Sequence, residues 1–287
     1  MQTGLKIKIF EAGHCVHPGF VVKPGSGLKP RSFPAAVALI QHPTQGNILF
    51  DTGYHEHFFR ATRPFPERFY AWTTPCHYQK EHGIVAQLAK EKIGPHEIEH
   101  LVLSHFHADH IAAVSEFAHS QLHCQQKGVD ALTKSGRVGG VRKGYLKALL
   151  PQQLESNLVM HRDFSIPIGE ILPHCQGVDL LCKDMFNDGL IYIVSLPGHA
   201  AGQVGLLTKR EQGWLFLLAD ACWLIESLSE NIDQHWLANM LCDDTQAYKQ
   251  TLSELRNCYQ NTHHFVRFVP SHCQATIQQL ITEGWIV

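Results

Sequence analysis

The amino-acid sequence predicts an α+β fold in which two β-sheets pack together and helices cover their outer faces. Strand patterns come in two batches, one within residues 5–103 and one from residue 178 onward, and each batch has helical patterns attached to it. Such an arrangement lets each sheet bury one face against the other. The 287 residues are 44% hydrophobic and 17% charged, which is typical of a folded chain. We expect a single domain spanning residues 1–287.

The first batch of strands begins near the N-terminus, where Leu5, Ile7 and Ile9 alternate with lysines. Apolar runs at 35–40 and 47–50 flank a turn-rich stretch and predict a hairpin that ends in Asp51-Thr52-Gly53. Residues 54–78 are crowded with aromatic residues and prolines, so an ordered but partly irregular segment is expected there.

The middle of the chain alternates between helical and strand patterns. Residues 83–92 predict a helix that ends before Gly94-Pro95, and residues 98–103 predict a short buried strand. A polar, histidine-rich segment follows, and then a helix-like run from residue 111. We expect residues 128–165 to form a helical insertion, because basic residues surround a Gly-Gly pair there and leucines then recur at positions 146, 149, 150 and 154.

The second batch of strands is expected at residues 180–182, 190–196, 204–208 and 214–218. The run from Asp243 to Gln246 resembles a helix N-cap, and the apolar stripe from Tyr248 to Tyr259 predicts the helix that follows. A last strand is expected at 265–269 and a last helix at 275–281.

Charge, hydropathy and cysteine usage exclude several classes of protein. The net charge of -2 and the pI of about 6.9 give no field that would attract nucleic acid or a membrane surface, so neither is expected as a partner. No apolar run is long enough to span a membrane. Nine widely spaced cysteines without a CxxC pair indicate a reducing compartment, so we expect a cytoplasmic protein.

Histidine is over-represented, with 21 copies against a combined 16 of Tyr, Trp and Met. Four residues of metal-binding types fall within six positions directly after the strand that ends at Leu103: His105, His107, Asp109 and His110. Imidazole and carboxylate groups suit zinc, iron, manganese or nickel rather than calcium. A histidine-rich surface loop would explain this run poorly, since the run follows a buried strand.

Three further residues of the same types stand where predicted strands end. His199 follows the strand at 190–196, Asp220 ends the run of apolar residues at 215–219, and His272 follows the strand at 265–269. Any one of them alone reads as an ordinary loop or capping residue. Together they predict one metal-binding edge of the two sheets.

The order His-x-His-x-Asp-His, Gly-His, Asp and Ser-His resembles the metallo-β-lactamase superfamily. The resemblance runs from Asp51 to His272 and implies an αβ/βα four-layer sandwich with two divalent metal ions, zinc first among the candidates. It implies a first metal on His105, His107 and His199, a second on Asp109, His110 and His272, and Asp220 bridging both, with a hydroxide between them as nucleophile. Asp109 would then relay a proton, and Asp51 would orient ligand histidines.

Within that superfamily the sequence is most similar to the N-acyl homoserine lactonase group. Asp220 argues against true β-lactamases, and only 15 residues follow His272, which leaves no room for the helical domain of glyoxalase II. The resemblance implies opening of a lactone, or cleavage of a related acyl ester or thioester. The aromatic segment would either supply an apolar wall for an acyl chain or pack over the rim of the sandwich. Phe69 and Trp72, together with Trp223, are the candidate pocket residues.

Two departures bear on the substrate. The lactonases carry Tyr three residues after the bridging Asp, where this chain has Trp223, and commonly carry Asp after the last His, where this chain has Cys273. Hydrolysis of a phosphodiester or phosphate ester is therefore an alternative, and a metal-retaining binding module without turnover is another. A homodimer through residues 54–78 is also left open.

Overall fold

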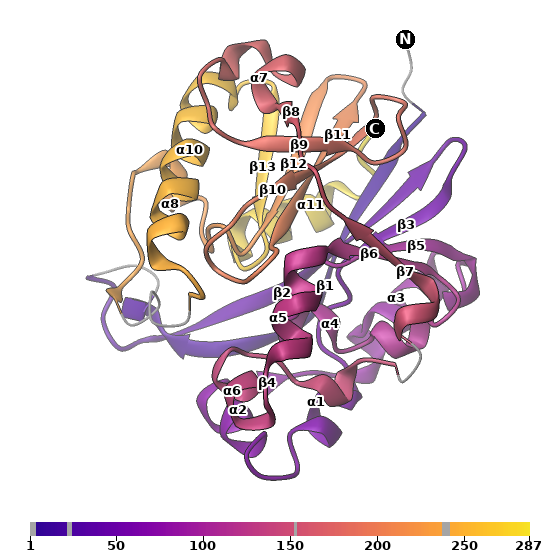
Figure 1. Cartoon of the computed structure of the whole chain (residues 1–287), viewed down its shortest axis with the longest axis vertical. Coiled ribbons are helices and arrows are strands. Elements are labelled where there is room, and N and C mark those ends of the chain that lie inside the picture. Colours follow the sequence, from indigo (N-terminus) through magenta and orange to yellow (C-terminus); the bar gives the residue numbers. More distant parts are fainter. Residues whose placement is uncertain (1–3, 22–24, 152–153, 237–241) are drawn as a thin grey trace.

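Two mixed β-sheets pack face to face in the computed structural model, which describes residues 4–21, 25–151, 154–236 and 242–287 (Figure 1). Within these residues the first sheet has the strand order β4-β1-β2-β3-β5-β6-β7, and the second has the order β13-β12-β11-β10-β9-β8. Helices lie on the outer faces of both sheets. The predicted α+β sandwich is confirmed.

The N-terminal half of the chain builds the first sheet. Strands β1, β2 and β3 pair antiparallel, as the predicted hairpin requires, whereas β3, β5, β6 and β7 pair parallel. The short β4 pairs with β1. The strands are β1 (Lys6–Pro18), β2 (Pro30–His42), β3 (Gly46–Phe50), β4 (Cys76–His77), β5 (Ile98–Val102), β6 (Gln121–Gln125) and β7 (Leu158–His161).

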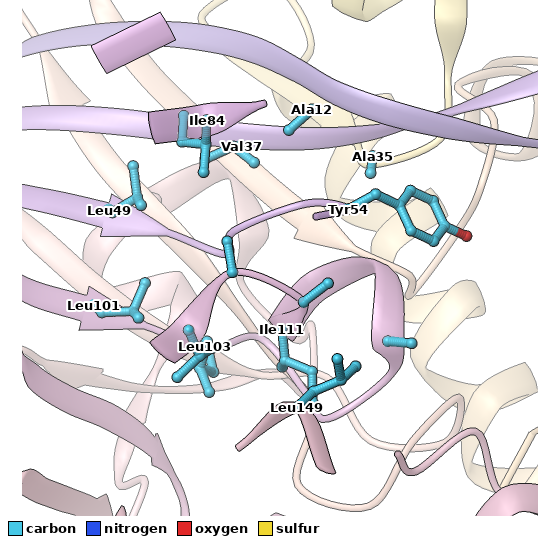
Figure 2. Close-up of a cluster of buried hydrophobic side chains, with 14 of the residues drawn as sticks. Ala12, Ala35, Val37, Leu49, Tyr54, Ile84, Leu101, Leu103, Ile111 and Leu149 are labelled. Carbon is cyan, nitrogen blue, oxygen red and sulfur yellow. The ribbon is translucent and has the colours of Figure 1, made fainter. Parts of the chain in front are cut away.

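The outer face of the first sheet carries an apolar core under short helices, part of which Figure 2 shows. Leu49 and Leu101 of the sheet and Ile84 of the predicted 83–92 helix are fully buried in it. The helices are α1 (Glu56–Ala61), α2 (Arg68–Thr73), α3 (Ile84–Lys90), α4 (Ala108–Ile111), α5 (Gln126–Lys134) and α6 (Arg137–Arg142). Short 3-10 turns join them: η1 (Gly19–Val21), η2 (Lys80–His82), η3 (Pro95–Glu97), η4 (Val114–Phe117), η5 (Lys147–Leu149) and η6 (Leu154–Asn157).

The C-terminal half builds the second sheet and its helical cover. Helix α10 (Thr245–Thr262) begins where the sequence predicts, because the Asp244 carboxylate accepts a hydrogen bond from the Ala247 N–H at 2.9 Å. The strands are β8 (Ile166–Pro167), β9 (Leu181–Asp184), β10 (Ile191–Ser195), β11 (Val204–Arg210), β12 (Gly213–Ala219) and β13 (Val266–Pro270). The remaining helices are α7 (Ile168–Ile171), η7 (Pro173–Cys175), α8 (Glu226–Ser229) and α11 (Gln274–Glu283).

A separate core fills the space between the sheets. Side chains from both sheets, such as Ile9 and Leu217, meet there with Ile277 and Leu280 of α11. Burial of this layer fixes how the two sheets are placed, and therefore brings the ends of strands from both sheets to a common edge.

The helix expected from residue 111 is wrong. Helix α4 ends at Ile111, and only the 3-10 turn η4 follows. The cause is Thr52, whose N–H and Oγ1 both donate to the His110 carbonyl, at 2.8 and 2.9 Å. In a continuing helix this carbonyl would instead accept from a backbone N–H of the next turn. Thr52 Oγ1 also accepts from the Ala113 N–H at 3.1 Å. These bonds tie the turn after β3 to the residues after α4.

The segment 128–165 is helical only in its first part. Most of α5 and all of α6 lie in it, but residues 158–161 form β7, which pairs parallel with β6 at the edge of the first sheet. The expected helical insertion is therefore corrected at residues 158–161, which form a strand. The leucines that suggested a helix, at positions 146, 149, 150 and 154, all precede this strand, so their spacing carried no information about residues 158–161.

Three buried histidines form a hydrogen-bonded row across β5, β6 and β7. His100 Nδ1 lies 2.9 Å from His123 Nε2, and His123 Nδ1 lies 3.0 Å from His161 Nε2. Burial, with the neighbouring imidazoles, lowers the pKa of His123 to about 3, and burial, with Lys183, lowers that of His161 to about 4. The row is therefore neutral when folded.

This row makes the fold sensitive to acid. The folded pKa of His123 lies below its unfolded value, so the unfolded chain takes up the proton first and stability falls as the pH drops below about 6.5. Between about pH 7 and pH 5 one such histidine costs roughly 2 kcal/mol. Urea unfolding at the two pH values should show a smaller difference in His123→Phe than in the wild type, and no change in the exposed control His119→Phe. An unchanged difference in His123→Phe would contradict the prediction.

In the part of the chain that the structure describes, no helix is both long enough and apolar enough to cross a membrane.

Candidate metal centre

The candidate metal ligands come from the ends of strands in both sheets. His105 and His107 follow β5, and Asp109 and His110 lie on α4 directly after them. His199, Asp220 and His272 follow β10, β12 and β13 of the second sheet. The structure brings all seven side chains together at one edge of the sandwich.

The side chains form two groups on either side of Asp220. Ligand atoms of His105, His107 and His199 lie within 4.8 Å of one another, and His199 Nε2 is 3.0 Å from His107 Nδ1. A second group within the same limit contains Asp109, His110 and His272. These are the two sets that the sequence resemblance implied.

Asp220 stands between the two groups. Its Oδ2 lies 3.3 Å from His199 Nε2 and 3.0 Å from His272 Nε2, so one carboxylate contacts a member of each set. The residue before it, Ala219, has a φ of 49°, a left-handed conformation that turns the chain sharply at the end of β12. Asp220 Oδ1 lies 3.2 Å from His110 Nε2, so the carboxylate faces members of both groups.

Ser104 and Asp51 fix the orientation of two ligand histidines. The fully buried Asp51 carboxylate accepts hydrogen bonds from the Ser104 N–H at 2.8 Å, from Ser104 Oγ at 2.7 Å and from His110 Nδ1 at 2.7 Å. Ser104 Oγ in turn lies 2.9 Å from His105 Nδ1. Because both Nδ1 atoms are engaged, the Nε2 atoms of His105 and His110 keep their lone pairs for a cation.

Two backbone features hold the remaining histidines. His272 Nδ1 donates to the Pro34 carbonyl at 2.7 Å, which leaves its Nε2 facing the site. Gly198, directly before His199, has a φ of 129°, and a Cβ there would lie 2.1 Å from the Tyr248 backbone nitrogen. Only glycine therefore lets the His199 loop pass the start of α10.

The polar atoms of the site fit a bound cation. His105 Nε2 is buried and has no hydrogen-bond partner among the described residues. His110 Nε2 and Asp220 Oδ1 lie 3.2 Å apart but are not aligned as a hydrogen bond. Buried nitrogen and oxygen atoms without a hydrogen-bond partner cost free energy unless a cation or a donor reaches them.

The electrostatics of the site also favour a bound cation. Burial, aided by neighbouring histidines, lowers the pKa of His105 and brings that of His199 to about 3, so both are neutral imidazoles, the form that binds metals. Burial opposes charge on His110 as well, but the carboxylates of Asp109, Asp51 and Asp220 outweigh it and raise the pKa of His110 well above its usual value. The carboxylates thus draw positive charge into the site.

A cavity of about 560 Å³ opens over this group of side chains. His107, Asp109, His199, Asp220 and His272 line its polar end. The rest of its wall is mostly apolar. Trp223, after β12, contributes to it, and the other apolar residues come from β1, β2, α2, α6 and the segments around them: Cys15, Val21, Phe33, Phe65, Pro66, Phe69, Tyr70, Val138 and Val141.

The predicted pocket residues divide in two. Phe69 and Trp223 line the cavity, but Trp72 does not. Trp72 is 64% exposed and packs edge-on against Phe69, with ring centroids 5.4 Å apart. On α2 the lining residues Phe69, Tyr70 and Thr73 share one arc of the helix, and Trp72 falls outside that arc. Its expected place in the pocket is corrected.

Trp223 supports the site rather than offering a free donor to the cavity. Its indole N–H donates to Asp220 Oδ2 at 3.0 Å. Indole has a single N–H, so this bond leaves no donor for a ligand carbonyl. At the position where the lactonases carry Tyr, this chain thus places an indole whose N–H is bonded to Asp220.

Sequence reasoning missed three contributors. Ser104 adjoins the histidine motif, and its place before His105 was the available signal. The Pro34 carbonyl could not be recognised from the sequence, because every residue has a backbone carbonyl. The α6 wall, with Val138 and Val141, comes from a part of the chain whose composition shows no relation to the site.

The match to known families decides which kind of protein this is. Residues 31–206 match the family model described as the metallo-beta-lactamase superfamily, which is more than half of the chain. The chain belongs to the metallo-β-lactamase superfamily. The matched range includes Asp51, His105 to His110 and His199, whereas Asp220 and His272 lie beyond it and join the site through the fold.

Individual members of the superfamily resemble this chain along most of its length. An N-acyl homoserine lactonase, AttM, from Azorhizobium caulinodans is 25% identical over 88% of this chain and 89% of its own. The N-acyl homoserine lactonase AiiB from Rhizobium rhizogenes is 24% identical over 88% of both chains.

Solved structures of the superfamily share the fold. An N-acyl homoserine lactone hydrolase with the product N-hexanoyl-L-homoserine bound at its catalytic metal center has a TM-score of 0.73, with 18% identity and 97% of each chain covered. AidC, a dizinc quorum-quenching lactonase, has a TM-score of 0.62, with 14% identity over 96% of this chain and 90% of its own.

Proposed function

We propose that this protein is a metal-dependent hydrolase that opens the ring of N-acyl homoserine lactones. One observation supports this most: a full His/Asp site for two cations lies at the end of a largely apolar cavity of about 560 Å³. Relatives aligned along most of the chain are lactonases of that substrate class. The polar end suits a lactone ring, and the apolar wall suits an acyl chain.

We assign the ligands as the sequence resemblance implied. His105, His107 and His199 would hold one divalent ion, Asp109, His110 and His272 the other, and Asp220 would bridge them. Zinc is the proposed metal, with iron, manganese and nickel acceptable to the same donors. When bound, the two ions lower the pKa of a water molecule between them and polarise the lactone carbonyl.

The nine widely spaced cysteines without a CxxC pair further support a cytoplasmic location.

The protein's own residues position and protonate the substrate. Asp109 stands at the cavity wall, with its Oδ2 3.4 Å from His272 Nε2 and its side chain 12% exposed, so it can receive a proton from the attacking water and deliver it to the departing ring oxygen. Trp223 holds Asp220 in place through its indole N–H. The aromatic wall excludes water from the acyl chain.

A substrate panel tests the proposal. N-hexanoyl-L-homoserine lactone, an acyl thioester and an activated phosphodiester should be offered to the metal-loaded protein. The expected result is gain of one water by the lactone, seen by mass spectrometry, with the phosphodiester left intact. Intact lactone alongside a cleaved phosphodiester would overturn the lactonase assignment and favour phosphoester hydrolysis.

The length of the acyl chain tests the cavity wall separately. Each methylene buried against an apolar wall contributes about 0.8 kcal/mol, so kcat/KM should rise roughly fourfold per methylene until the wall ends. In Phe69→Ala the advantage of N-decanoyl over N-hexanoyl substrate should fall about 15-fold, equivalent to roughly two methylenes. Phe59→Ala is the control, since Phe59 is similarly exposed, at 41% against 48%, and does not line the cavity. An unchanged chain-length preference in Phe69→Ala would contradict an acyl chain at this wall.

A further inference from the structure

A second group of metal-binding side chains lies away from the proposed catalytic centre. His55, His57 and Glu116 each offer a ligand atom, and these atoms lie within 4.8 Å of one another. His55 is the N-cap of α1, His57 lies in the first turn of that helix, and Glu116 lies in η4. Neither the catalytic group nor the cavity over it includes any of the three.

The contacts of the three side chains are those of a preformed site. His57 Nε2 lies 2.6 Å from Glu116 Oε1, and the His55 and His57 rings lie 4.3 Å apart between centroids. The hydrogen bond between His57 and Glu116 explains the placement of these two side chains but not that of His55. His55 is buried, and its Nδ1 accepts only a long bond of 3.5 Å from the His57 N–H. Its ring is thus placed beside the pair without a strong bond to hold it there.

Charge around this group favours a cation. Burial and the neighbouring His57 lower the pKa of His55, so this ring is neutral and its Nδ1 lone pair is engaged by no more than the long bond from the His57 N–H. Glu56 and Glu116 both act on His55 as negative charges, and Arg60, the nearby cation, is paired with Glu56. Two imidazoles and one carboxylate make a donor set that zinc and similar ions bind, with water completing the coordination.

We propose that His55, His57 and Glu116 bind a third divalent transition-metal ion that stabilises the structure next to the catalytic centre. The ion would replace the proton shared by His57 and Glu116. It would join two segments that both lead into the centre: the turn from Asp51 to His57, and the segment from Asp109 to Glu116. These segments already meet where Thr52 bonds to the His110 carbonyl and Ala113 N–H. The ion would therefore brace the Asp51–His110 contact without touching substrate.

Metal stoichiometry tests the proposal with zinc alone as the probe. Metal-depleted full-length protein is dialysed against buffered micromolar free zinc, and the bound zinc is measured by mass spectrometry. His57→Gln and Glu116→Gln should each hold one equivalent less than the wild type. His14→Gln is the matched control, since His14 also faces a glutamate, Glu11, at 3.3 Å and stacks on a histidine, His77, yet lies in no three-ligand group among the described residues. This control should bind as much zinc as the wild type.

The catalytic centre and this third site are separated by a second measurement. Zinc added to metal-depleted Asp220→Asn protein should still raise the melting temperature, and the further change His57→Gln should remove most of that rise. Equal zinc content in the wild type, His57→Gln and Glu116→Gln would overturn the third site, whatever the catalytic centre holds. Failure of the lactonase assignment would leave this stoichiometry difference in place, so the two outcomes are distinguishable.

Discussion

Asp220→Asn is expected to reduce lactone turnover by about 10³-fold or more, the largest loss of any single change at the site. The carboxylate contacts His199 and His272, one from each ligand group, so its replacement affects both cation positions at once. An amide also presents N–H groups where only acceptors suit a cation. Metal content should fall together with turnover, and steady-state kinetics with metal analysis of the same samples checks both.

The control for Asp220→Asn is Asp163→Asn. Asp163 is exposed and lies outside the site, and its φ of 53° is one that Asn tolerates, so the same chemical change is made without touching a ligand. Its turnover and metal content should match those of the wild type. Turnover of Asp220→Asn within tenfold of the wild type would remove Asp220 from the proposed bridging role.

Asp51→Ala is expected to destabilise the fold by about 3–5 kcal/mol and to lower the melting temperature by roughly 10 °C. The change leaves the Ser104 N–H, the Ser104 hydroxyl and His110 Nδ1 without their buried acceptor. It also places Ala at a φ of 60°, a conformation that costs a residue with a Cβ about 1–2 kcal/mol. Thermal unfolding followed by circular dichroism measures the loss.

Asp51→Asn separates stability from metal binding. Asn fits the same volume and tolerates positive φ, so most of the stability should return. The amide N–H, however, would donate to His110 Nδ1 and push the imidazole proton onto Nε2, which then cannot bind a cation. Metal affinity should therefore fall about 10–100-fold. Wild-type metal affinity in Asp51→Asn would show that Asp51 does not set the His110 tautomer.

The sequence predicted the two-sheet fold and the members of the site because both leave local signals. Alternation in the N-terminal strand and apolar runs around turns reveal strands, and the segment from His105 to His110 holds four candidate ligand residues in one short run. His199, Asp220 and His272 were recognisable because each follows a run of strand residues, and parallel neighbours such as β12 and β13 end at the same edge.

What the sequence could not predict depends on contacts between distant segments. The helix expected from residue 111 stops early because Thr52, 58 positions away from His110, takes up its carbonyl. The Pro34 carbonyl holds His272 across 238 positions and has no side chain to mark it. Each case is a tertiary contact that overrides a local pattern.

Metal reconstitution tests the central claim most directly. Protein depleted of metal is given zinc in steps, and hydrolysis of N-hexanoyl-L-homoserine lactone is measured at each step. Turnover should be negligible in the depleted protein, should rise as zinc fills the catalytic centre, and should level off once two equivalents occupy it. Full turnover in the depleted protein, or no turnover at any zinc content, would contradict a metal-dependent lactonase.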